Sequence, residues 1–552
     1  MLEKIEDFVE EYGCCGIVAI IGAIALYIGA LYLFFRYAFI YVLFIAALIM
    51  AVWILVNFSK ACARCMKREL PGAADIKPTG SQPAYKQYFF RQAFIDLKDI
   101  TLENYELNKE SILTIIEGTK DKLFSAETKT LITWPLGIAI FIAIPFAIIL
   151  GGAVYLIVTA IHVLAVLLSA SVIVMTAMVF RAIEYLNMAR WRIFFACPSC
   201  YERFSMPVYS CPNCNAQHTK LVPGQYGIFK RKCECGNLLP TLFLNGKNKL
   251  PSKCPHCNHP LTAEAGVSIN VHYPIVGGRS SGKSSFLVAS MMVLSEKSKK
   301  EGFELSFPEK DGEQAFKKSA NDFKTGITLL HTTLNPKPKA FLVKLQKNKK
   351  KPAHLIYMYD AAGEIFEDLD SLRHHKYFEY LSGIFFLIDP FSIPVIKQEY
   401  ESELSEYYKN VSPSEEPPHT IYDRMIINLE QYRGQKKVLL QEGKYKIPIA
   451  VIITKSDAFD LQSKITSLNP ELFNAGKNKI EEDIFSEQIR DWLSNNGEGN
   501  FVRSVESMFT NVKYFSCSAL GHMPDAASDR PFTPKNVDAP IKWVFSFRKI
   551  FD

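Results

Sequence analysis

The chain has 552 residues, with 63 Lys and Arg against 56 Asp and Glu and a formal net charge of +7. This length predicts several domains. The positive surplus is too small to indicate a nucleic-acid-binding protein by itself, so nucleic acid is not an expected partner, although charge alone does not exclude it.

Two apolar runs near the N-terminus predict membrane spans. The first covers residues 13–58 and is interrupted only by Arg36; the second covers residues 131–180 and has no charged residue. About 20 apolar residues cross a bilayer, whereas one helix over the second run would be roughly 75 Å long. We therefore predict a turn between Gly151 and His162, and four α-helical spans in two transmembrane hairpins.

Basic residues follow the second and fourth predicted spans. The positive-inside rule then places the N-terminus, the loop at 59–130 and the C-terminal region in the cytoplasm. The acidic N-terminus argues against a signal peptide. The spans carry few polar groups, so a lipid-bilayer anchor is favoured over a conduit, and small residues such as Gly22 and Ala25 suit packing into a homo-oligomer. The basic residues are Lys60, Arg64, Lys67, Arg68, Arg181, Arg190 and Arg192.

Four close cysteine pairs lie between the apolar runs and the C-terminal region. Two pairs together supply the four thiolates that tetrahedral Zn²⁺ takes, and an all-cysteine site leaves no open position for catalysis. A redox role would explain one such pair but not four. The simplest pairing is sequential, which predicts two structural zinc sites in tandem zinc ribbons of small β structure. The pairs are Cys197/Cys200, Cys211/Cys214, Cys233/Cys235 and Cys254/Cys257.

A phosphate-binding loop follows the next apolar strand. Residues 277–284 fit G-x-x-x-x-G-K-[ST], with an apolar strand before them and a helix after them. Backbone N–H groups of such a loop wrap the phosphates, Lys283 would reach the β- and γ-phosphates, and the Ser284 hydroxyl would hold Mg²⁺. The predicted nucleotide-binding residues here are Gly277, Gly278, Arg279, Ser280, Ser281, Gly282, Lys283, Ser284 and Ser285.

A second string would complete the magnesium and γ-phosphate site. The strand 355–359 ends at Asp360, whose carboxylate would reach Mg²⁺ directly or through water, and Gly363 would offer its N–H to the γ-phosphate. A threonine before the strand 340–345 is expected to contact both Mg²⁺ and the γ-phosphate. We choose Thr332 or its neighbour Thr333, because they lie nearest to that strand, over Thr325 and Thr328.

Two further sequence motifs predict which base the bound nucleotide carries. The carboxylate of Asp457, in Thr454-Lys455-Ser456-Asp457, can accept two hydrogen bonds side by side from guanine but not from adenine. The Lys455 stem would pack over the base while its ammonium reaches the ring oxygen or the phosphate loop. The run Ser518-Ala519-Leu520 would place the Ala519 N–H on the guanine oxygen.

The motifs described above, taken in their order along residues 265–552, resemble those of a P-loop GTPase domain of the translation-factor (TRAFAC) class. The resemblance implies an α/β fold with a mainly parallel sheet, GTP or GDP with Mg²⁺ as ligands, and Lys283, Thr332 and Glu364 as catalytic residues. Two positions depart from the class. Thr454 replaces an Asn whose amide braces the phosphate loop, and Glu364 replaces a water-positioning Gln, so hydrolysis is expected to be slow or to need a protein activator. Arg279 could supply positive charge to the phosphates from within the loop, but it is expected to face solvent.

A narrower resemblance covers residues 197–552. It rests on strings at 221–227, 233–236, 254–257, 360–364, 389–390 and 540–543. These resemble bacterial membrane-anchored double-GTPase-type proteins with tandem zinc ribbons, which are associated with conflict and defence systems. The resemblance implies an integral protein of a bacterial inner membrane.

The chain is therefore predicted to be multi-domain, with helical membrane hairpins, zinc ribbons and a C-terminal GTPase domain. Three functions remain open: a GTPase switch with an unknown protein effector, a GTP-binding membrane scaffold with negligible turnover that works by self-assembly, and a GTP-gated membrane-perturbing effector. The predicted parts are an N-terminal transmembrane hairpin (1–58), a cytoplasmic linker and helical region (59–130), a second transmembrane hairpin with an exit helix (131–192), two zinc ribbons with four cysteine ligands each (193–264) and the GTPase domain (265–552).

Overall fold

The computed structural model of the chain forms two compact units, which are described separately below. The smaller unit comprises residues 1–180 and 223–238, and the larger comprises residues 181–222 and 239–552. The residues that the structure describes are 2–71, 82–124, 133–327, 340–347, 351–360, 376–431, 440–441, 443–466, 479–524 and 530–551.

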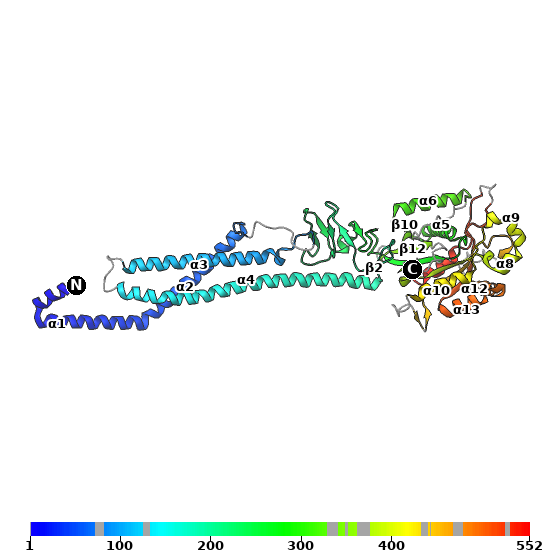
Figure 1. Cartoon of the computed structure of the whole chain (residues 1–552). Helices are drawn as coiled ribbons and strands as arrows, with labels where there is room; N and C mark the ends of the chain where they lie inside the picture. The colour runs from blue at the N-terminus through cyan, green and yellow to red at the C-terminus, as the bar shows by residue number, and fades with distance from the viewer. Residues whose placement is uncertain are drawn as a thin grey trace. The chain divides into compact units, whose positions relative to one another are not determined.

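The smaller unit is built from long helices (Figure 1). Two helical stretches of the described residues, Cys15–Met66 and Gly137–Trp191, are long and apolar enough to cross a membrane, judged by length and composition. The elements are α1 (Leu2–Leu33), the π-helical turn η1 (Phe34–Ala38), α2 (Phe39–Met66), the 3₁₀ turn η3 (Tyr88–Phe90), α3 (Gln92–Phe124) and α4 (Thr133–Trp191), which continues into the larger unit.

The first predicted hairpin is wrong, because the chain stays helical where the hairpin turn was expected. The π-helical turn at Phe34–Ala38 includes Arg36 and joins α1 directly to α2, with a bend that is visible in Figure 1. Both residues that flank this turn, Leu33 and Phe39, have right-handed helical backbone angles. A π-helical insertion bends a helix without ending it.

The predicted turn between Gly151 and His162 is also wrong. Helix α4 runs unbroken through both residues, and even Pro145 does not end it. Gly151 serves packing instead, since a Cβ there would lie 3.1 Å from Cδ1 of Ile54 on α2. At 59 residues and a rise of about 1.5 Å per residue, α4 is roughly 88 Å long, which is nearly three times a bilayer core.

Helix α3 is far more polar than its neighbours and packs along α2. The side-chain amide of Asn57, which is buried on α2, donates to Oδ1 of Asn108 at 2.9 Å and to Oγ of Ser111 at 3.3 Å on α3. The Tyr155 hydroxyl of α4 donates to the carbonyl of Thr101 over 3.0 Å. A polar helix therefore lies against both apolar helices.

In the larger unit, short strands carry three of the cysteine pairs. Each pair lies in the tight turn of a β-hairpin: β1 (Phe195–Ala196) with β2 (Arg203–Phe204), β3 (Val208–Ser210) with β4 (Gln217–His218), and β7 (Ser252–Lys253) with β8 (Pro260–Leu261). These turns end in left-handed residues, at Tyr201, Asn215 and Asn258. The neighbouring elements are β5 (Lys230–Lys232, in the smaller unit), β6 (Leu238–Pro240) and the 3₁₀ turns η5 (Phe243–Asn245) and η6 (Lys247–Lys249).

Seven strands of the described residues form one sheet, in the order β10-β11-β12-β9-β13-β16-β17. The five strands from β12 to β17 run parallel, and β10 and β11 form an antiparallel edge. This confirms the predicted mainly parallel sheet. The strands are β9 (Ile269–Val276), β10 (Glu304–Ser306), β11 (Ala340–Gln346), β12 (His354–Asp360), β13 (Ile384–Ile388), β16 (Ile449–Ile453) and β17 (Val512–Ser516).

Helices cover both faces of the sheet, with α5 and α6 on one side and α10, α12 and α13 on the other (Figure 1). The central strands β13 and β16 are buried at every position, as continuous apolar runs of parallel strands require. The helices are α5 (Lys283–Glu301), α6 (Lys310–Lys324), α8 (Pro394–Glu399), α9 (Glu401–Val411), α10 (Pro418–Gln431), α11 (Leu461–Ile465), α12 (Lys479–Leu493), α13 (Gly499–Met508) and α14 (Asp538–Ser546).

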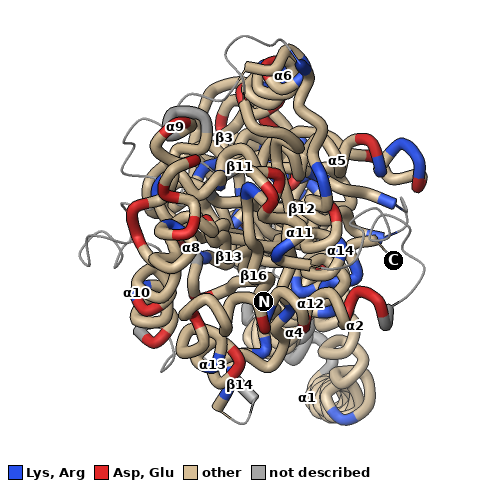
Figure 2. The backbone as a smooth tube through the Cα atoms, turned by 90° about the vertical axis from the view of Figure 1, so that its right-hand side faces the viewer, with Lys and Arg blue, Asp and Glu red and all other residues tan. Residues whose placement is uncertain are grey.

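Short elements complete the larger unit, and residues of both charges occur along its chain. Basic and acidic residues are interspersed over its elements in Figure 2. The short elements are the turns η8 (Lys376–Tyr380), η9 (Pro390–Ser392) and η12 (Ser494–Glu498), and the hairpin of β14 (Leu440–Gln441) and β15 (Lys444–Tyr445).

Candidate nucleotide site and metal centre

The predicted nucleotide-binding strings meet at one edge of the sheet. Parallel strands end on the same edge, so the segments that follow β9, β12, β13, β16 and β17 converge there. Ligands of open α/β sheets bind outside these carboxyl ends. The phosphate loop follows β9, Asp360 ends β12, Thr454 follows β16, and Cys517 with Ser518 follows β17.

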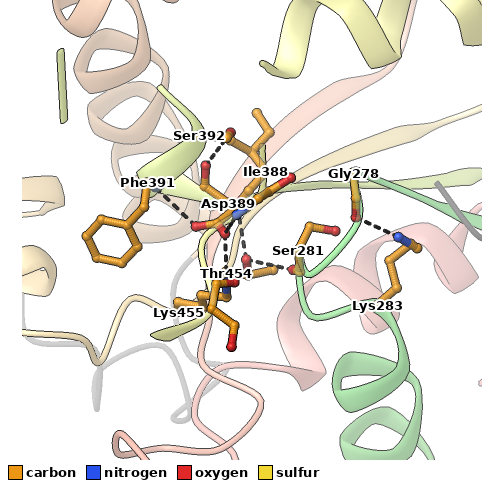
Figure 3. Close-up of polar contacts among 11 residues, drawn as sticks. Gly278, Ser281, Lys283, Ile388, Asp389, Phe391, Ser392, Thr454 and Lys455 are labelled. Atoms are coloured by element: carbon orange, nitrogen blue, oxygen red, sulfur yellow. Dashed lines mark hydrogen bonds and ion pairs between the residues drawn. The ribbon is translucent and has the colours of Figure 1, made fainter. Parts of the chain in front are cut away.

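The phosphate loop occupies the turn between β9 and α5 (Figure 3). Ser280 and Gly282 have left-handed backbone angles, with φ of 60° and 87°. The Lys283 ammonium donates to the carbonyls of Gly277 at 2.9 Å and Gly278 at 2.6 Å, which curls it over the loop. A Cβ at Gly277 would lie 2.8 Å from the Leu387 carbonyl, so the loop needs glycine there. Arg279 is exposed, as expected.

Thr454 braces the phosphate loop, although its replacement of an Asn was expected to remove that brace. Its Oγ1 donates to the Ser281 carbonyl at 2.9 Å and lies 3.1 Å from the Ile388 carbonyl. The Thr454 hydroxyl therefore makes the hydrogen bond to the phosphate loop that the amide of an Asn was expected to make. The expectation was wrong because a threonine hydroxyl can donate in place of the amide.

The Lys455 ammonium was predicted to reach the ring oxygen or the phosphate loop, and in the structure it contacts two residues outside that loop. It donates to Oδ2 of Asp389 at 2.7 Å (Figure 3). It also donates to the Ser412 carbonyl at 2.9 Å. Asp389 follows β13 and is 1% exposed. Sequence reasoning gave it no role at the site, although one signal was available: a carboxylate directly after a fully apolar strand of a parallel sheet lies at the ligand edge.

Backbone hydrogen bonds hold together the two segments that are predicted to read the base. The Ser456 N–H donates to the Cys517 carbonyl over 3.4 Å, and the Cys517 N–H donates to the Ile453 carbonyl over 2.9 Å. Burial raises the pKa of the Cys517 thiol, and the nearby Asp457 carboxylate raises it further. Asp457 thus lies beside the segment that carries Ser518, Ala519 and Leu520.

That second segment is itself fixed. Ser518 exchanges two backbone hydrogen bonds with Lys535, at 3.0 and 2.8 Å, and its Oγ accepts from the Gly521 N–H at 2.6 Å. A Cβ at Gly521 would lie 1.9 Å from the Thr533 carbonyl, so this turn requires glycine. The loop is thus held from both sides.

The remaining predicted residues are placed only in part. Thr332, Gly363 and Glu364 lie outside the described residues, as do Thr328 and Thr333. Asp360 is placed through its backbone, which pairs with Ile275 at the end of β12. Ser284 and Ser285 lie in the first turn of α5 and are partly buried.

Four thiols of the larger unit come together, but not in the sequential pairing that was predicted. Cys197 and Cys200 group with Cys254 and Cys257, and all four sulfur atoms lie within 4.8 Å of one another. The sequential pairing is wrong because the turns of two hairpins distant in sequence, β1-β2 and β7-β8, meet in the fold. The two other pairs divide between the units, with Cys211 and Cys214 in the larger and Cys233 and Cys235 in the smaller.

The geometry of this first group suits zinc. Sγ of Cys197 lies 3.5 Å from Sγ of Cys257, and Sγ of Cys200 lies 3.7 Å from Sγ of Cys254. A tetrahedral ion with Zn–S bonds of about 2.3 Å would separate its sulfurs by about 3.8 Å. Backbone N–H groups of Ser199 and His256 point at the sulfurs of Cys197 and Cys254, both at 3.4 Å. The donor set could therefore hold one ion.

The Cys197–Cys200 turn packs directly on the seven-stranded sheet through the residue that follows it. Tyr201 has a left-handed φ of 56° and is 3% exposed. Its ring meets that of Tyr359 edge-on at 5.6 Å, one residue before Asp360, and its carbonyl accepts from the Tyr380 hydroxyl at 2.8 Å. Contacts on both sides of residues 361–375 thus converge on the cysteine turn.

A buried ion pair ties the end of α4 to the cysteine-bearing segment. Glu184 accepts from Nζ of Lys247 at 3.2 Å and from the Phe243 N–H at 2.6 Å. Lys247 is 1% exposed, and burial lowers its pKa while Glu184 opposes the shift. Removing one partner of such a pair strands a buried charge, so this contact fixes the C-terminal turns of α4 within the larger unit.

The parallel sheet, the phosphate loop and the segments after β16 and β17 mark the C-terminal region as a P-loop GTPase domain. Residues 273–518 match the sequence model of the family described as Double-GTPase 2. This region is therefore a GTP-binding P-loop GTPase domain of the double-GTPase type.

Comparison with other known proteins adds little detail. Among solved structures, the Arl6 BBS3 small GTPase from Trypanosoma brucei with bound nucleotide analogue GppNp matches at 10% sequence identity and a TM-score of 0.21. That match covers 50% of this chain and 96% of the other. A search of curated proteins gives no match.

Proposed function

We propose that the chain is a membrane-anchored GTPase that hydrolyses GTP to GDP and phosphate and works as a conformational switch. The observation that carries the proposal is the hydrogen bond from Thr454 to the Ser281 carbonyl. It joins the loop expected to read the base to the loop expected to hold the phosphates. One nucleotide would then contact both loops at the same sheet edge.

Different residues of the site would contact different parts of the nucleotide. The backbone of residues 277–282 would wrap the phosphates, Lys283 would neutralise the β- and γ-phosphates, and Ser284 with Asp360 and Thr332 would hold Mg²⁺. Gly363 would contact the γ-phosphate, and Glu364 would orient the attacking water. Because Glu364 adds negative charge beside the γ-phosphate, unaided hydrolysis would be slow.

Guanine would be selected by Asp457 and the Ala519 N–H, while the Lys455 stem packs over the base. In the structure the ammonium of Lys455 is already engaged by Asp389, so the stem rather than the charge would meet the base. Asp457→Asn should weaken GTP binding and favour xanthosine triphosphate, whose edge offers an acceptor where guanine has a donor. Equal affinity of the unaltered chain for ATP and GTP would refute this assignment.

Hydrolysis is tested by multiple-turnover phosphate release from the full chain in lipid nanodiscs. Ser284→Ala serves as the matched control, since it removes the proposed magnesium ligand from the same preparation. Phosphate release that Ser284→Ala abolishes supports the switch. GTP binding without turnover, with or without lipid, would favour the alternative of a scaffold that works by self-assembly.

Membrane anchoring is supported by the two apolar helices. A chain anchored by them should stay with the membrane pellet in alkaline carbonate, and extraction into the supernatant would refute anchoring. The narrower sequence resemblance suggests a bacterial inner membrane and a role in conflict or defence. A GTP-gated membrane-perturbing effector remains the second alternative, and GTP-independent leakage of dye from liposomes would count against it.

The protein would bind two structural zinc ions, each held by four cysteines. Cys197, Cys200, Cys254 and Cys257 fit the first by their sulfur spacing. By elimination, the pairs Cys211/Cys214 and Cys233/Cys235 would supply the second, since each offers two thiols on a tight turn. Metal analysis of the purified chain should find two zinc equivalents. The contacts of Tyr201 would let the first ion support the segment around Asp360.

A further inference from the structure

A buried carboxylate links the loop after β13 to the nucleotide site. The side chain of Asp389 has no accessible surface. Its Oδ1 accepts from the Phe391 N–H at 3.1 Å, and its Oδ2 accepts from the Ser414 N–H and from Nζ of Lys455, both at 2.7 Å. Buried carboxylates are retained in folded chains when paired in this way.

The segment Ser412–Ser414 shares this network. It connects α9 to α10, and its first residue has a left-handed φ of 46°. The Ser412 carbonyl accepts from Nζ of Lys455 at 2.9 Å, so the ammonium is held between Asp389 and Ser412. Both partners of Lys455 are therefore supplied by parts of the fold outside the base-reading string.

The same segment rests on the phosphate loop. A Cβ at Gly278 would lie 2.4 Å from Oγ of Ser414 and 3.0 Å from Cδ1 of Ile421 on α10. Ser414 is 4% exposed, and its hydroxyl has no hydrogen-bond partner among the described residues. The Ser412–Ser414 segment can therefore approach the phosphate loop closely only because residue 278 is a glycine. Ser414 contacts Gly278 by packing rather than by hydrogen bonding.

We propose that Ser412–Ser414, together with Asp389, is an internal brace that positions Lys455 and the phosphate loop for guanine nucleotide. Asp389 is then a positioning residue that acts through Lys455. The segment acts through its backbone, the Ser414 N–H on Asp389 and the Ser412 carbonyl on Lys455, while the Ser414 side chain packs against Gly278. This inference rests on the proposed function, because it assumes that a guanine nucleotide binds at this edge.

The Asp389 part is tested by a double-mutant cycle on the full chain in nanodiscs, with GDP affinity as the measurement. Asp389→Asn keeps the shape but loses the charge that fixes Lys455, and Lys455→Met keeps the stem but loses the ammonium. Each should weaken GDP binding by about tenfold or more, since hydrogen bonds to charged groups are involved. The double variant should be no weaker than the worse single variant, because both changes break one contact.

The matched control is Glu184→Gln, which removes the charge of another buried Lys pair in the same unit. It should lower thermal stability while leaving GDP affinity within about twofold. An equal loss of affinity in Glu184→Gln, or additive losses in the cycle, would overturn the positioning role. GDP binding by the unaltered chain is measured first, and its absence would refute the proposed function rather than the brace.

The Ser414 part is tested by complementary substitution. Gly278→Ala should weaken GDP binding by about tenfold, because its Cβ collides with the Ser414 hydroxyl. Ser414→Ala alone should change little, since the hydroxyl it removes has no partner among the described residues. In the double variant the two Cβ atoms would lie 3.7 Å apart, an ordinary contact. Affinity should therefore return to within about threefold of the unaltered chain; no recovery would overturn the contact.

Discussion

The Thr454 hydroxyl donates a hydrogen bond to the Ser281 carbonyl over 2.9 Å, and the same oxygen lies 3.1 Å from the Ile388 carbonyl. A hydroxyl has one hydrogen, and the Ile388 carbonyl already accepts from the Thr454 N–H at 2.9 Å, so the hydroxyl is available to the Ser281 carbonyl. Ser281 and Thr454 are both buried. This buried hydrogen bond thus joins the phosphate loop to the end of β16, directly before the residues that are predicted to read the base.

Thr454→Val should weaken GDP binding by about tenfold. The substitution keeps the shape of the side chain but leaves a buried carbonyl without its donor, which costs roughly 1–3 kcal/mol. Affinity is measured by fluorescence titration of the full chain. Thr325→Val is the matched control, because Thr325 makes similar hydrogen bonds to backbone carbonyls in α6 but is exposed. Unchanged affinity in Thr454→Val would show that the link does not position the loop.

Loss of the first cysteine group should destabilise the GTPase domain as well as release metal. In Cys197→Ser, the full chain should lose about one zinc equivalent, because a structural site depends on all four ligands. Tyr201 would lose its fixed position against Tyr359 and Tyr380, so the thermal midpoint should fall by at least about 5 °C; 1 kcal/mol corresponds to roughly 2–4 °C in domains of this size.

Metal analysis and thermal unfolding check this prediction together. Cys15→Ser is the control, since Cys15 is an exposed thiol on α1 and belongs to none of the four pairs. Full zinc content in Cys197→Ser would contradict the assignment of the site. A lost zinc without a change in the midpoint would contradict the coupling through Tyr201.

Acid should destabilise the larger unit through a buried histidine. Burial, and then the charges of Arg203 and Arg548, lower the pKa of His272 to about 3. The pKa in the unfolded chain is about 6.5, so between these values the unfolded chain binds a proton that the folded chain does not. The contribution is therefore complete above about pH 6.5 and is lost as pH falls, at up to about 1.4 kcal/mol per unit.

Denaturant unfolding between about pH 7.5 and 5.5 measures this effect as a slope. His272→Phe should flatten the dependence of the unfolding free energy on pH by up to one proton equivalent, whatever it does to the absolute stability. His354 adds a further component, because burial lowers its pKa to about 4. Identical slopes in the unaltered chain and in His272→Phe would show that His272 is protonated in the folded state.

The features that the sequence predicted well are those set by neighbouring residues. The phosphate loop needs Gly277 and Lys283 six positions apart between a strand and a helix, and this information is local. The sheet class followed from continuous apolar strands such as 384–388. Both patterns can be recognised in the sequence without knowing which distant residues pack together.

The features it missed depend on contacts between distant residues. The pairing of Cys197 with Cys257 depends on how two hairpins meet, and the bond from Lys455 to Asp389 joins residues 66 positions apart. The predicted turn in α4 assumed that an apolar run must fold back to fit one bilayer thickness, whereas the helix is unbroken and Gly151 packs against Ile54. Spacing alone carries no information about such partners.

The packing of α3 along α2 and α4 bears on which helices can meet lipid. Glu106 and Lys109 of α3 are more than half exposed, and they lie close in sequence to Asn108, which is bonded to Asn57 of α2. A charged side chain in the middle of a bilayer costs about 2.5–3.5 kcal/mol or more. The hydrocarbon core therefore cannot surround the middle of α3, and within the first apolar stretch the lipid-facing length should lie largely in α1 and the start of α2.

Labelling of engineered cysteines in the full chain in nanodiscs tests this placement. Leu102 on α3 and Ile28 on α1 are 53% and 59% exposed in the protein, so they form a matched pair. A charged, water-soluble maleimide should modify Leu102→Cys but not Ile28→Cys, because lipid covers only the second. In detergent with the reagent in excess, Ile28→Cys should become more reactive. Protection of both positions in nanodiscs would place α3 in lipid, whereas rapid labelling of both would refute anchoring through α1.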